Sequence, residues 1–171
     1  MFLAHMPAGY LASTFLLSKR RFQQSNTKWL LFAGLLGSVF PDFDMLYFYT
    51  IDNRQHGHHS YWTHIPFFWI CIFAISYSIA IFLRSRILAT SSTVFFTCIL
   101  LHLALDSFAG GGIKWLYPIT HTYFSIFSVP GGNHYWILNY LLHWTALVEL
   151  TIILLALFLF FKTRNNQRRA T

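Results

Sequence analysis

Long apolar stretches constrain this chain more than any other feature of its sequence. A bilayer core of about 30 Å is crossed by about 20 apolar helical residues. Two stretches, Ile65–Leu83 and Ile87–Leu105, meet that requirement and contain no Asp, Glu, Lys or Arg. A longer stretch, Tyr135–Phe161, follows, and two shorter ones, Phe2–Leu17 and Trp29–Phe40, precede them. The sequence therefore predicts five helical segments, of which the first two are marginal as full membrane spans.

The composition favours a membrane-embedded chain over a soluble one. Of the 171 residues, 56% are hydrophobic and 10% are charged, whereas an ordinary soluble domain is about 25% charged. Too little polar surface therefore exists to cover a soluble core, and the 20% aromatic content excludes disorder. The first apolar stretch lacks the basic residues that open a signal peptide, so we expect it to be retained. We expect one all-α domain over residues 1–171, a polytopic helical membrane bundle of four to five hydrophobic helices.

The distribution of basic residues predicts the orientation of this bundle. Cytoplasmic connections of membrane proteins are enriched in Lys and Arg, and all but Arg54 and Lys114 of the twelve basic residues lie in alternate connections or after the last segment. Residues 41–64 and 106–134 are then expected outside an inner (plasma) membrane. The basic residues form no stripe, so no nucleic-acid partner is expected. Those assigned to the cytoplasm are Lys19, Arg20, Arg21, Lys28, Arg84, Arg86, Lys162, Arg164, Arg168 and Arg169.

Histidines and carboxylates gather at the outward ends of the predicted helices. Nine histidines accompany only five acidic residues, and ionisable groups at membrane depth are costly enough to be functional candidates wherever they occur. Helices that alternate in direction bring these groups to one membrane face. The convergence favours a metal site over a set of hydrogen-bonded helix ends. Three pairs carry this hypothesis, namely Asp42 with Asp44, His59 with His64, and His102 with Asp106, the last four residues apart and so on one helix face.

Four motifs follow one another along the chain, and they are His5-x3-Gly9, Pro41-Asp42-x-Asp44, His59-x3-Thr63-His64 and His102-x3-Asp106. In this order, and followed by Leu116-Tyr117-Pro118, they resemble the YdjM-like membrane-bound metal-dependent hydrolases (the LexA-binding, inner membrane-associated hydrolase type). The resemblance covers residues 1 to about 120 and extends distantly to the zinc-dependent phospholipase C and nuclease group. It implies a metal site formed by His5, Asp42, Asp44, His59, His64, His102 and Asp106.

The donor types of this site agree with metal-dependent hydrolysis. Carboxylate oxygens and imidazole nitrogens suit zinc, and mixed carboxylate sites also suit manganese or iron. We expect one or two metals and hydrolysis of a phosphoester in a membrane lipid or lipid-linked substrate. With two metals, Asp42 or Asp44 is expected to bridge them. Asp44 is also the candidate general base, and His59 the candidate general acid.

One motif departs from the family pattern. The family's His-Arg-Gly-x-Thr-His-Ser appears here with Ser60 and Tyr61 in place of the Arg and the Gly. A phosphate-binding role for that Arg therefore has no direct counterpart in this chain. Arg54 and Lys114 are the remaining basic residues on the outward side, and either is a candidate to replace it.

Two other classes of function remain open. A membrane transporter, or a metal-binding protein without catalysis, predicts ligands along a path across the bilayer, and His143 and Glu149 lie deeper than the rest. A haem-binding bundle would use His102 and His143 as axial ligands, although paired histidines at matching depth are missing. The remaining histidines are expected to be loop residues or an extension of the site, and they are His56, His58, His121 and His134.

Overall fold

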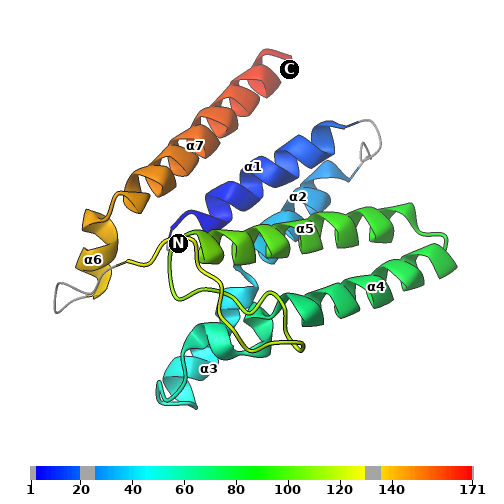
Figure 1. The fold of residues 1–171 in the computed structure, drawn as a ribbon. Helices are drawn as coiled ribbons and strands as arrows, with labels where there is room; N and C mark the ends of the chain where they lie inside the picture. Colours follow the sequence, from blue (N-terminus) through cyan, green and yellow to red (C-terminus); the bar gives the residue numbers. More distant parts are fainter. Residues whose placement is uncertain (1–2, 20–25, 130–135, 171) are drawn as a thin grey trace.

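The computed structural model describes residues 3–19, 26–129 and 136–170, which form helices and connecting loops (Figure 1). Within these ranges the structure contains no strand, and two isolated bridges join the loop after α5, Ala109 to Phe127 and Ile113 to Phe124. The predicted all-α bundle is therefore confirmed. The longer helices are α1 (His5–Ser18), α2 (Thr27–Val39), α4 (Pro66–Phe82), α5 (Arg86–Phe108) and α7 (Thr145–Ala170). The shorter ones are η2 (Pro41–Phe43), α3 (Asp44–Thr50), η3 (His58–Ser60), η4 (Trp62–His64) and α6 (Trp136–Leu142).

Two helices of the described residues are long and apolar enough to cross a membrane, α5 and the Thr145–Asn166 part of α7. Helix α2 and the segment Pro41–Thr50 meet the same criterion together, as a pair bent by 53°. Pro41 causes the break, because proline lacks an N–H and clashes with the preceding helical turn. The sequence predicts a span over Ile65–Leu83, and α4 covers this stretch to within one residue at each end, although its 17 residues make it one of the shorter apolar helices.

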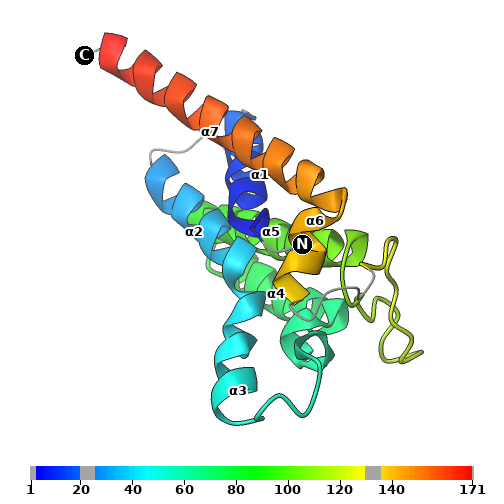
Figure 2. The ribbon, with the colours of Figure 1, turned by 90° about the vertical axis from the view of Figure 1, so that its left-hand side faces the viewer.

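The last apolar stretch forms two helices where the sequence predicts one. Helix α6 ends at Leu142, and α7 begins at Thr145, whose Oγ1 lies 2.9 Å from Nδ1 of His143. Helix α7 packs against α1 and lies along the outside of the bundle (Figure 2). Its Glu149 accepts a 2.7 Å hydrogen bond from the backbone N–H of Leu3. Of the deeper polar groups of this stretch, Glu149 thus binds the start of the chain, and His143 contacts the first residue of α7.

Small residues allow α1, α2 and α5 to pack closely, as they do between membrane helices in general. Gly9 lies against Ser38, and a Cβ atom at Gly37 would clash with the backbone carbonyl of Phe95 on α5. On its other side α5 packs against α4, and these two helices enclose a buried apolar cluster. The cluster consists of Trp69, Phe96, Ile99, Leu103 and, from the loop after α5, Ile113.

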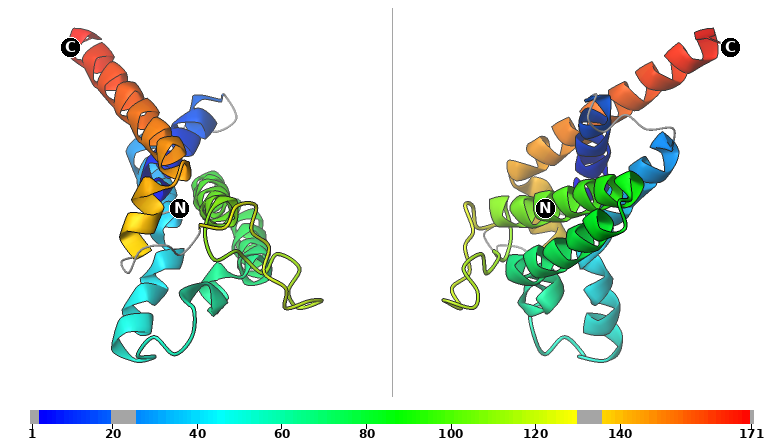
Figure 3. Two further views of the ribbon diagram at one scale, coloured as in Figure 1. Left: turned by 60° about the vertical axis from the view of Figure 1, so that its left-hand side comes forward. Right: turned by 90° about the vertical axis from the view of Figure 1, so that its right-hand side faces the viewer.

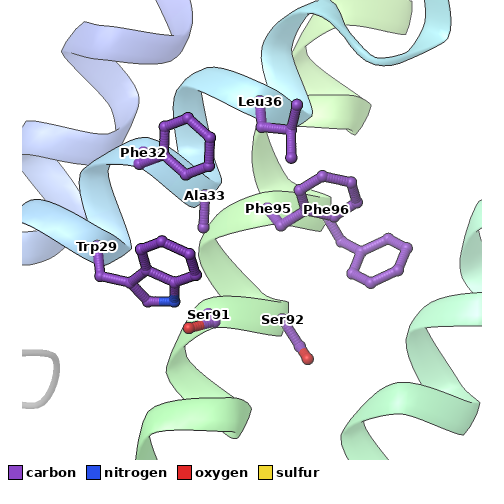
Figure 4. A pocket seen from close by; sticks show the side chains of 8 residues that line it. All are labelled: Trp29, Phe32, Ala33, Leu36, Ser91, Ser92, Phe95 and Phe96. Atoms are coloured by element: carbon purple, nitrogen blue, oxygen red, sulfur yellow. The ribbon is translucent and has the colours of Figure 1, made fainter.

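A shallow apolar groove of about 230 Å³ lies between α2 and α5 (Figure 4). Trp29, Phe32 and Leu36 line it from α2, and Phe95 and Phe96 from α5. On α2 every lining residue precedes Pro41, and on α5 every lining residue precedes His102. The groove therefore occupies the amino-terminal halves of the two helices, away from the ends that carry the histidines and carboxylates.

Successive helices run in alternating directions, so the connections fall at two ends of the molecule (Figures 1 and 3). The start of α1, helix α3 and the loop after α5 lie at one end. The end of α1, the α4–α5 turn and the end of α7 lie toward the other end, and the described basic residues assigned to the cytoplasm accompany them. The charge asymmetry of the sequence is thus an asymmetry of the folded molecule.

Candidate metal centre

Segments far apart in the sequence bring polar side chains together at the end of the bundle opposite the basic residues. Pro41 ends α2 and turns the chain into η2 and α3, while 3-10 turns lead the chain back toward α4. These turns meet the last turns of α5 and the first turn of α1. The structure places there all seven residues that the sequence predicts, namely His5 (α1), Asp42 (η2), Asp44 (α3), His59 (η3), His64 (η4), and His102 and Asp106 (α5).

A backbone carbonyl orients the imidazole of His102. Its Nδ1 lies 2.8 Å from the carbonyl oxygen of Ser38, an arrangement that puts the proton on Nδ1 and leaves the Nε2 lone pair for a metal. That Nε2 atom is buried and makes no hydrogen bond of good geometry with the described residues. It lies 3.1 Å from Asp106 Oδ2 and 3.5 Å from Asp42 Oδ1. His102 thus presents a ligand atom between two carboxylates.

Asp44 orients His64 in the same way. Its Oδ2 atom lies 2.7 Å from His64 Nδ1 and also accepts a hydrogen bond from Thr63 Oγ1. His64 Nε2 is left buried, 3.7 Å from Asp42 Oδ1 and 3.7 Å from Asp106 Oδ2. Trp69 holds the turn in place, because its indole Nε1 donates to the carbonyl oxygen of Thr63 at 2.7 Å. Asp44 therefore contacts the cluster through His64.

His59 and His5 approach Asp106 from different sides. His59 Nδ1 lies 3.1 Å from the carbonyl oxygen of Gly112, and its Nε2 lies 3.7 Å from Asp106 Oδ2. Gly112 has a φ of 75°, and a Cβ there would press on the backbone of Phe124, so a glycine suits this turn. His5 Nε2 lies 3.1 Å from Asp106 Oδ1, and its ring stacks on that of His102.

The separations between these donor atoms fit the coordination of a metal ion. Ligand atoms bound to a tetrahedral zinc ion lie roughly 3.3 Å apart, and the nitrogen–oxygen separations above run from 3.1 to 3.7 Å. Two of the nitrogens, His64 Nε2 and His102 Nε2, are buried without a hydrogen bond to the described residues. Three groups of residues each offer ligand atoms within 4.8 Å of one another, and they are His5 with Asp42 and His102, His64 with His102 and Asp106, and His58 with His59 and His64.

Asp42 forms the open edge of the cluster. Its side chain is 38% exposed, whereas that of Asp106 is 3% exposed and those of His64 and His102 are fully buried. His58, at 30%, is also accessible. Asp42 and His58 are therefore the most accessible side chains of the cluster.

Two histidines outside the membrane-spanning helices have pKa values shifted in opposite directions. Burial lowers the pKa of His59 to about 3, although Asp106 acts against this shift. Burial also disfavours the charged form of His64, but the nearby carboxylates of Asp42 and Asp44 outweigh it and raise the pKa of that histidine above its usual range. His59 is therefore neutral at physiological pH, a state that suits a metal ligand and disfavours the predicted general-acid role.

His58, which the sequence leaves open as a loop residue or an extension of the site, lies in the cluster. Its ring centroid lies 4.1 Å from that of His59 and 4.9 Å from that of His64. Its Nδ1 lies 3.7 Å from Asp44 Oδ1. Adjacency to His59 is the one sequence signal that points to it, because both residues share the 3-10 turn η3.

Other outward polar residues have partners away from the cluster. His56 Nδ1 lies 2.8 Å from Asp52, and the ring of His121 packs edge-on against Tyr117. His134 lies outside the described residues. The two basic candidates for a phosphate-binding role contact aromatic rings instead, Arg54 over Tyr49 and Lys114 over Tyr123.

Comparison with known proteins decides the family. The family model described as YdjM inner membrane protein matches residues 1–168. The chain belongs to the YdjM inner membrane protein family. Membership and the apolar helices α5 and α7 together make it a membrane protein. Neither the curated proteins nor the solved structures contain a match to this YdjM family member.

Proposed function

We propose that this YdjM family protein is a membrane-embedded metal-dependent hydrolase that cleaves a phosphoester of a lipid or lipid-linked substrate. The observation that carries the proposal is the convergence of oriented imidazoles and carboxylates. His102 and His64 present buried Nε2 atoms within 3.7 Å of Asp42 and Asp106. Asp42, His102 and Asp106 would hold the cation, together with His5 or His64. Zinc is the expected ion, with manganese or iron as alternatives.

The side chains have distinct tasks in this proposal. A divalent cation bound in such a site lowers the pKa of its water to about 7 and polarises a phosphoryl oxygen. Asp44 and the carbonyl of Ser38 fix the imidazoles of His64 and His102. Asp44 is buried and already hydrogen-bonded, so we assign it a positioning role. Asp42, the exposed carboxylate, is then the group placed to accept a proton from the attacking water.

Apolar surface around the cluster supports a lipid as the substrate. Leu46 on α3 is 72% exposed, and Ile51, the first residue after the end of α3, is 65% exposed. In the loop after α5, Leu116 is 63% exposed and Ile119 is 90% exposed. An exposed apolar surface at the end of membrane-spanning helices fits the interface with the bilayer. A substrate that reaches Asp42 past these side chains would therefore carry an apolar part.

The site is proposed to face the extracytoplasmic side. Apart from Arg54 and Lys114, the described basic residues gather at the end of the bundle opposite the His/Asp cluster, and the positive-inside rule assigns that end to the cytoplasm. Ligands also gather at one end and do not follow a path across the bilayer, as a transporter would require. Glu149, which lies deeper, is engaged by the backbone of Leu3.

Metal content of detergent-purified protein tests the proposal. Elemental mass spectrometry on the wild type is expected to find bound zinc, manganese or iron, which the double variant His102→Ala/Asp106→Ala loses. The double variant His56→Ala/Asp52→Ala is the matched control, because it removes another histidine and aspartate four residues apart, which pair outside the cluster. That control should retain its metal.

The same preparations separate the metal site from the reaction. Hydrolysis of phosphoester lipids in mixed micelles is expected for the wild type and the control, and not for His102→Ala/Asp106→Ala. A folded wild-type protein without bound metal would contradict the proposal. Bound metal without hydrolysis of any lipid phosphoester would favour the non-catalytic metal-binding alternative.

A further inference from the structure

Of the three groups of possible ligands, two have no residue in common. One group consists of His5, Asp42 and His102, and the other of His58, His59 and His64. Within each group, one ligand atom from every residue lies within 4.8 Å of the others. The second group contains three imidazoles and no carboxylate, and its member His58 lies outside the four motifs of the sequence.

Asp106 lies between the two groups, with Oδ1 near the first group only and Oδ2 near members of both. Its Oδ1 lies 3.1 Å from His5 Nε2, in the first group. Its Oδ2 lies 3.7 Å from the Nε2 atoms of His59 and His64, in the second group. The same oxygen is 3.1 Å from His102 Nε2. A carboxylate in this position is able to bridge two cations, one oxygen to each.

His58 has the features of a metal ligand, and it does not belong to the first group. Its Nδ1 is buried and makes no hydrogen bond with the described residues, although the rest of the side chain is partly accessible. The nearest acceptor, Asp44 Oδ1, is 3.7 Å away and is also buried without a hydrogen-bond partner among those residues. Buried polar atoms without partners are rare in native proteins and often mark a bound water or ion.

Three imidazoles close together require a shared partner. The ring centroids of His58, His59 and His64 are separated by 4.1 to 4.9 Å. One divalent cation is able to bind three neutral imidazole nitrogens at once. Three imidazoles with a further open position are a known ligand set of catalytic zinc.

We propose that His58, His59 and His64 hold a second divalent cation, which Asp106 bridges to the cation of the first group. This proposal rests on the proposed function, because it takes the cation at Asp42, His102 and Asp106 as given. Pairs of cations in phosphoesterases lie about 3.5–4 Å apart and stabilise both the attacking and the leaving oxygen. The second cation would lie on the accessible side, at the edge formed by His58.

Metal stoichiometry tests the second cation directly. The purified protein is stripped with a chelator, reloaded with excess Zn²⁺, desalted and analysed for zinc per chain. We expect two zinc ions in the wild type, one in His58→Ala and two in His56→Ala. His56 is the matched control, since it lies two residues away in the same loop and pairs with Asp52. Circular dichroism and gel filtration establish that each variant is folded.

Reloading with Mn²⁺ gives a second measurement that needs only the wild type. Two bridged Mn²⁺ ions are magnetically coupled, so their electron paramagnetic resonance spectrum differs from the six-line signal of an isolated ion. We expect the coupled spectrum in the wild type and the six-line signal in His58→Ala. The wild-type spectrum alone shows whether two ions are coupled, so this measurement remains decisive if His58→Ala does not fold.

Each outcome separates the two proposals. One zinc ion in both the wild type and His58→Ala, with an uncoupled manganese spectrum, would overturn the second cation and leave the proposed function standing. Two zinc ions in folded His58→Ala would overturn the role of His58. No zinc in the wild type would overturn the proposed function and this inference together.

Discussion

His64 shows how one residue depends on its partners for its chemical role. Asp44 and Thr63 hold its Nδ1 side, and the Nε2 atom is thereby directed at Asp42 and Asp106. Partners of this kind fix both the tautomer and the orientation of a ligating imidazole. The contacts of His64 therefore lead to two predictions about the affinity of the site for a metal.

Replacing Asp44 should weaken metal binding without abolishing it. We expect Asp44→Ala to lower zinc affinity about 10–100-fold, the usual cost of removing a carboxylate that orients a ligating histidine. Asp44→Asn keeps an acceptor oxygen for His64 Nδ1 and should have a smaller effect. Competition with a zinc-binding dye measures both affinities, and equal affinity of Asp44→Ala and wild type would contradict the positioning role.

Metal affinity should rise with pH. The pKa of His64 is raised above its usual value, so in the metal-free protein this imidazole keeps its proton to a higher pH than a free imidazole does, and it must release that proton before it binds a cation. Each released proton makes affinity increase by about tenfold per pH unit below the raised pKa. Calorimetric titration with Zn²⁺ at about pH 6 and about pH 8 tests whether the affinity rises with pH. The same affinity at both pH values, or a tighter one at low pH, would be inconsistent with it.

Helices α2 and α5 carry Asp42, His102 and Asp106, so the spacing of these elements sets the geometry of the first group. Gly37 on α2 faces the backbone of Phe95 on α5, where no side chain fits. The two helices approach this closely because Gly37 has no side chain. The atoms opposite it belong to a backbone, which cannot move aside as a flexible side chain does.

A substitution at Gly37 should therefore separate the two helices. We expect Gly37→Ala to destabilise the protein by about 1–3 kcal/mol, the usual cost of overpacking, and to reduce bound zinc. Gly57→Ala is the matched control, because no atom lies within 4 Å of a Cβ at that position. Thermal unfolding in detergent measures the difference. Equal stability of the two variants would show that α2 and α5 tolerate a wider spacing.

At the scale of the whole molecule, the charge asymmetry assigns the two ends of the bundle to the two sides of the membrane. Gln55 is exposed at the end that carries the His/Asp cluster, and Lys28 is exposed at the opposite end. The positive-inside rule then predicts that Gln55 faces outward and Lys28 faces the cytoplasm.

Cysteine labelling tests this orientation. In a Cys71→Ser background, which removes the exposed native thiol, Gln55→Cys should react with a membrane-impermeant maleimide in spheroplasts. Lys28→Cys should react only after the membrane is opened. The reverse pattern would place the cluster in the cytoplasm and would leave the metal site itself unaffected.

The features that the sequence predicts well depend on residues that are close together in the chain. The apolar stretches identify the helices because the length of a span follows from the thickness of a bilayer. His102 and Asp106 share a helix face because four residues make about one helical turn. Longer-range features were missed. The last stretch is broken at His143 and Trp144, since contacts with neighbouring segments decide where a helix ends.

By itself, the sequence determined that this chain is a helical membrane bundle, that most of its basic residues lie opposite the cluster of histidines and aspartates, and which motifs carry the candidate ligands. Only the tertiary structure decided which nitrogen of each histidine faces the cluster, because that choice depends on contacts with distant residues. His59 is oriented by Gly112, and His102 by Ser38. The fold also brings His58 into the cluster and leaves His56 outside it, although the two are nearly adjacent in the chain, because a turn directs neighbouring side chains to different sides.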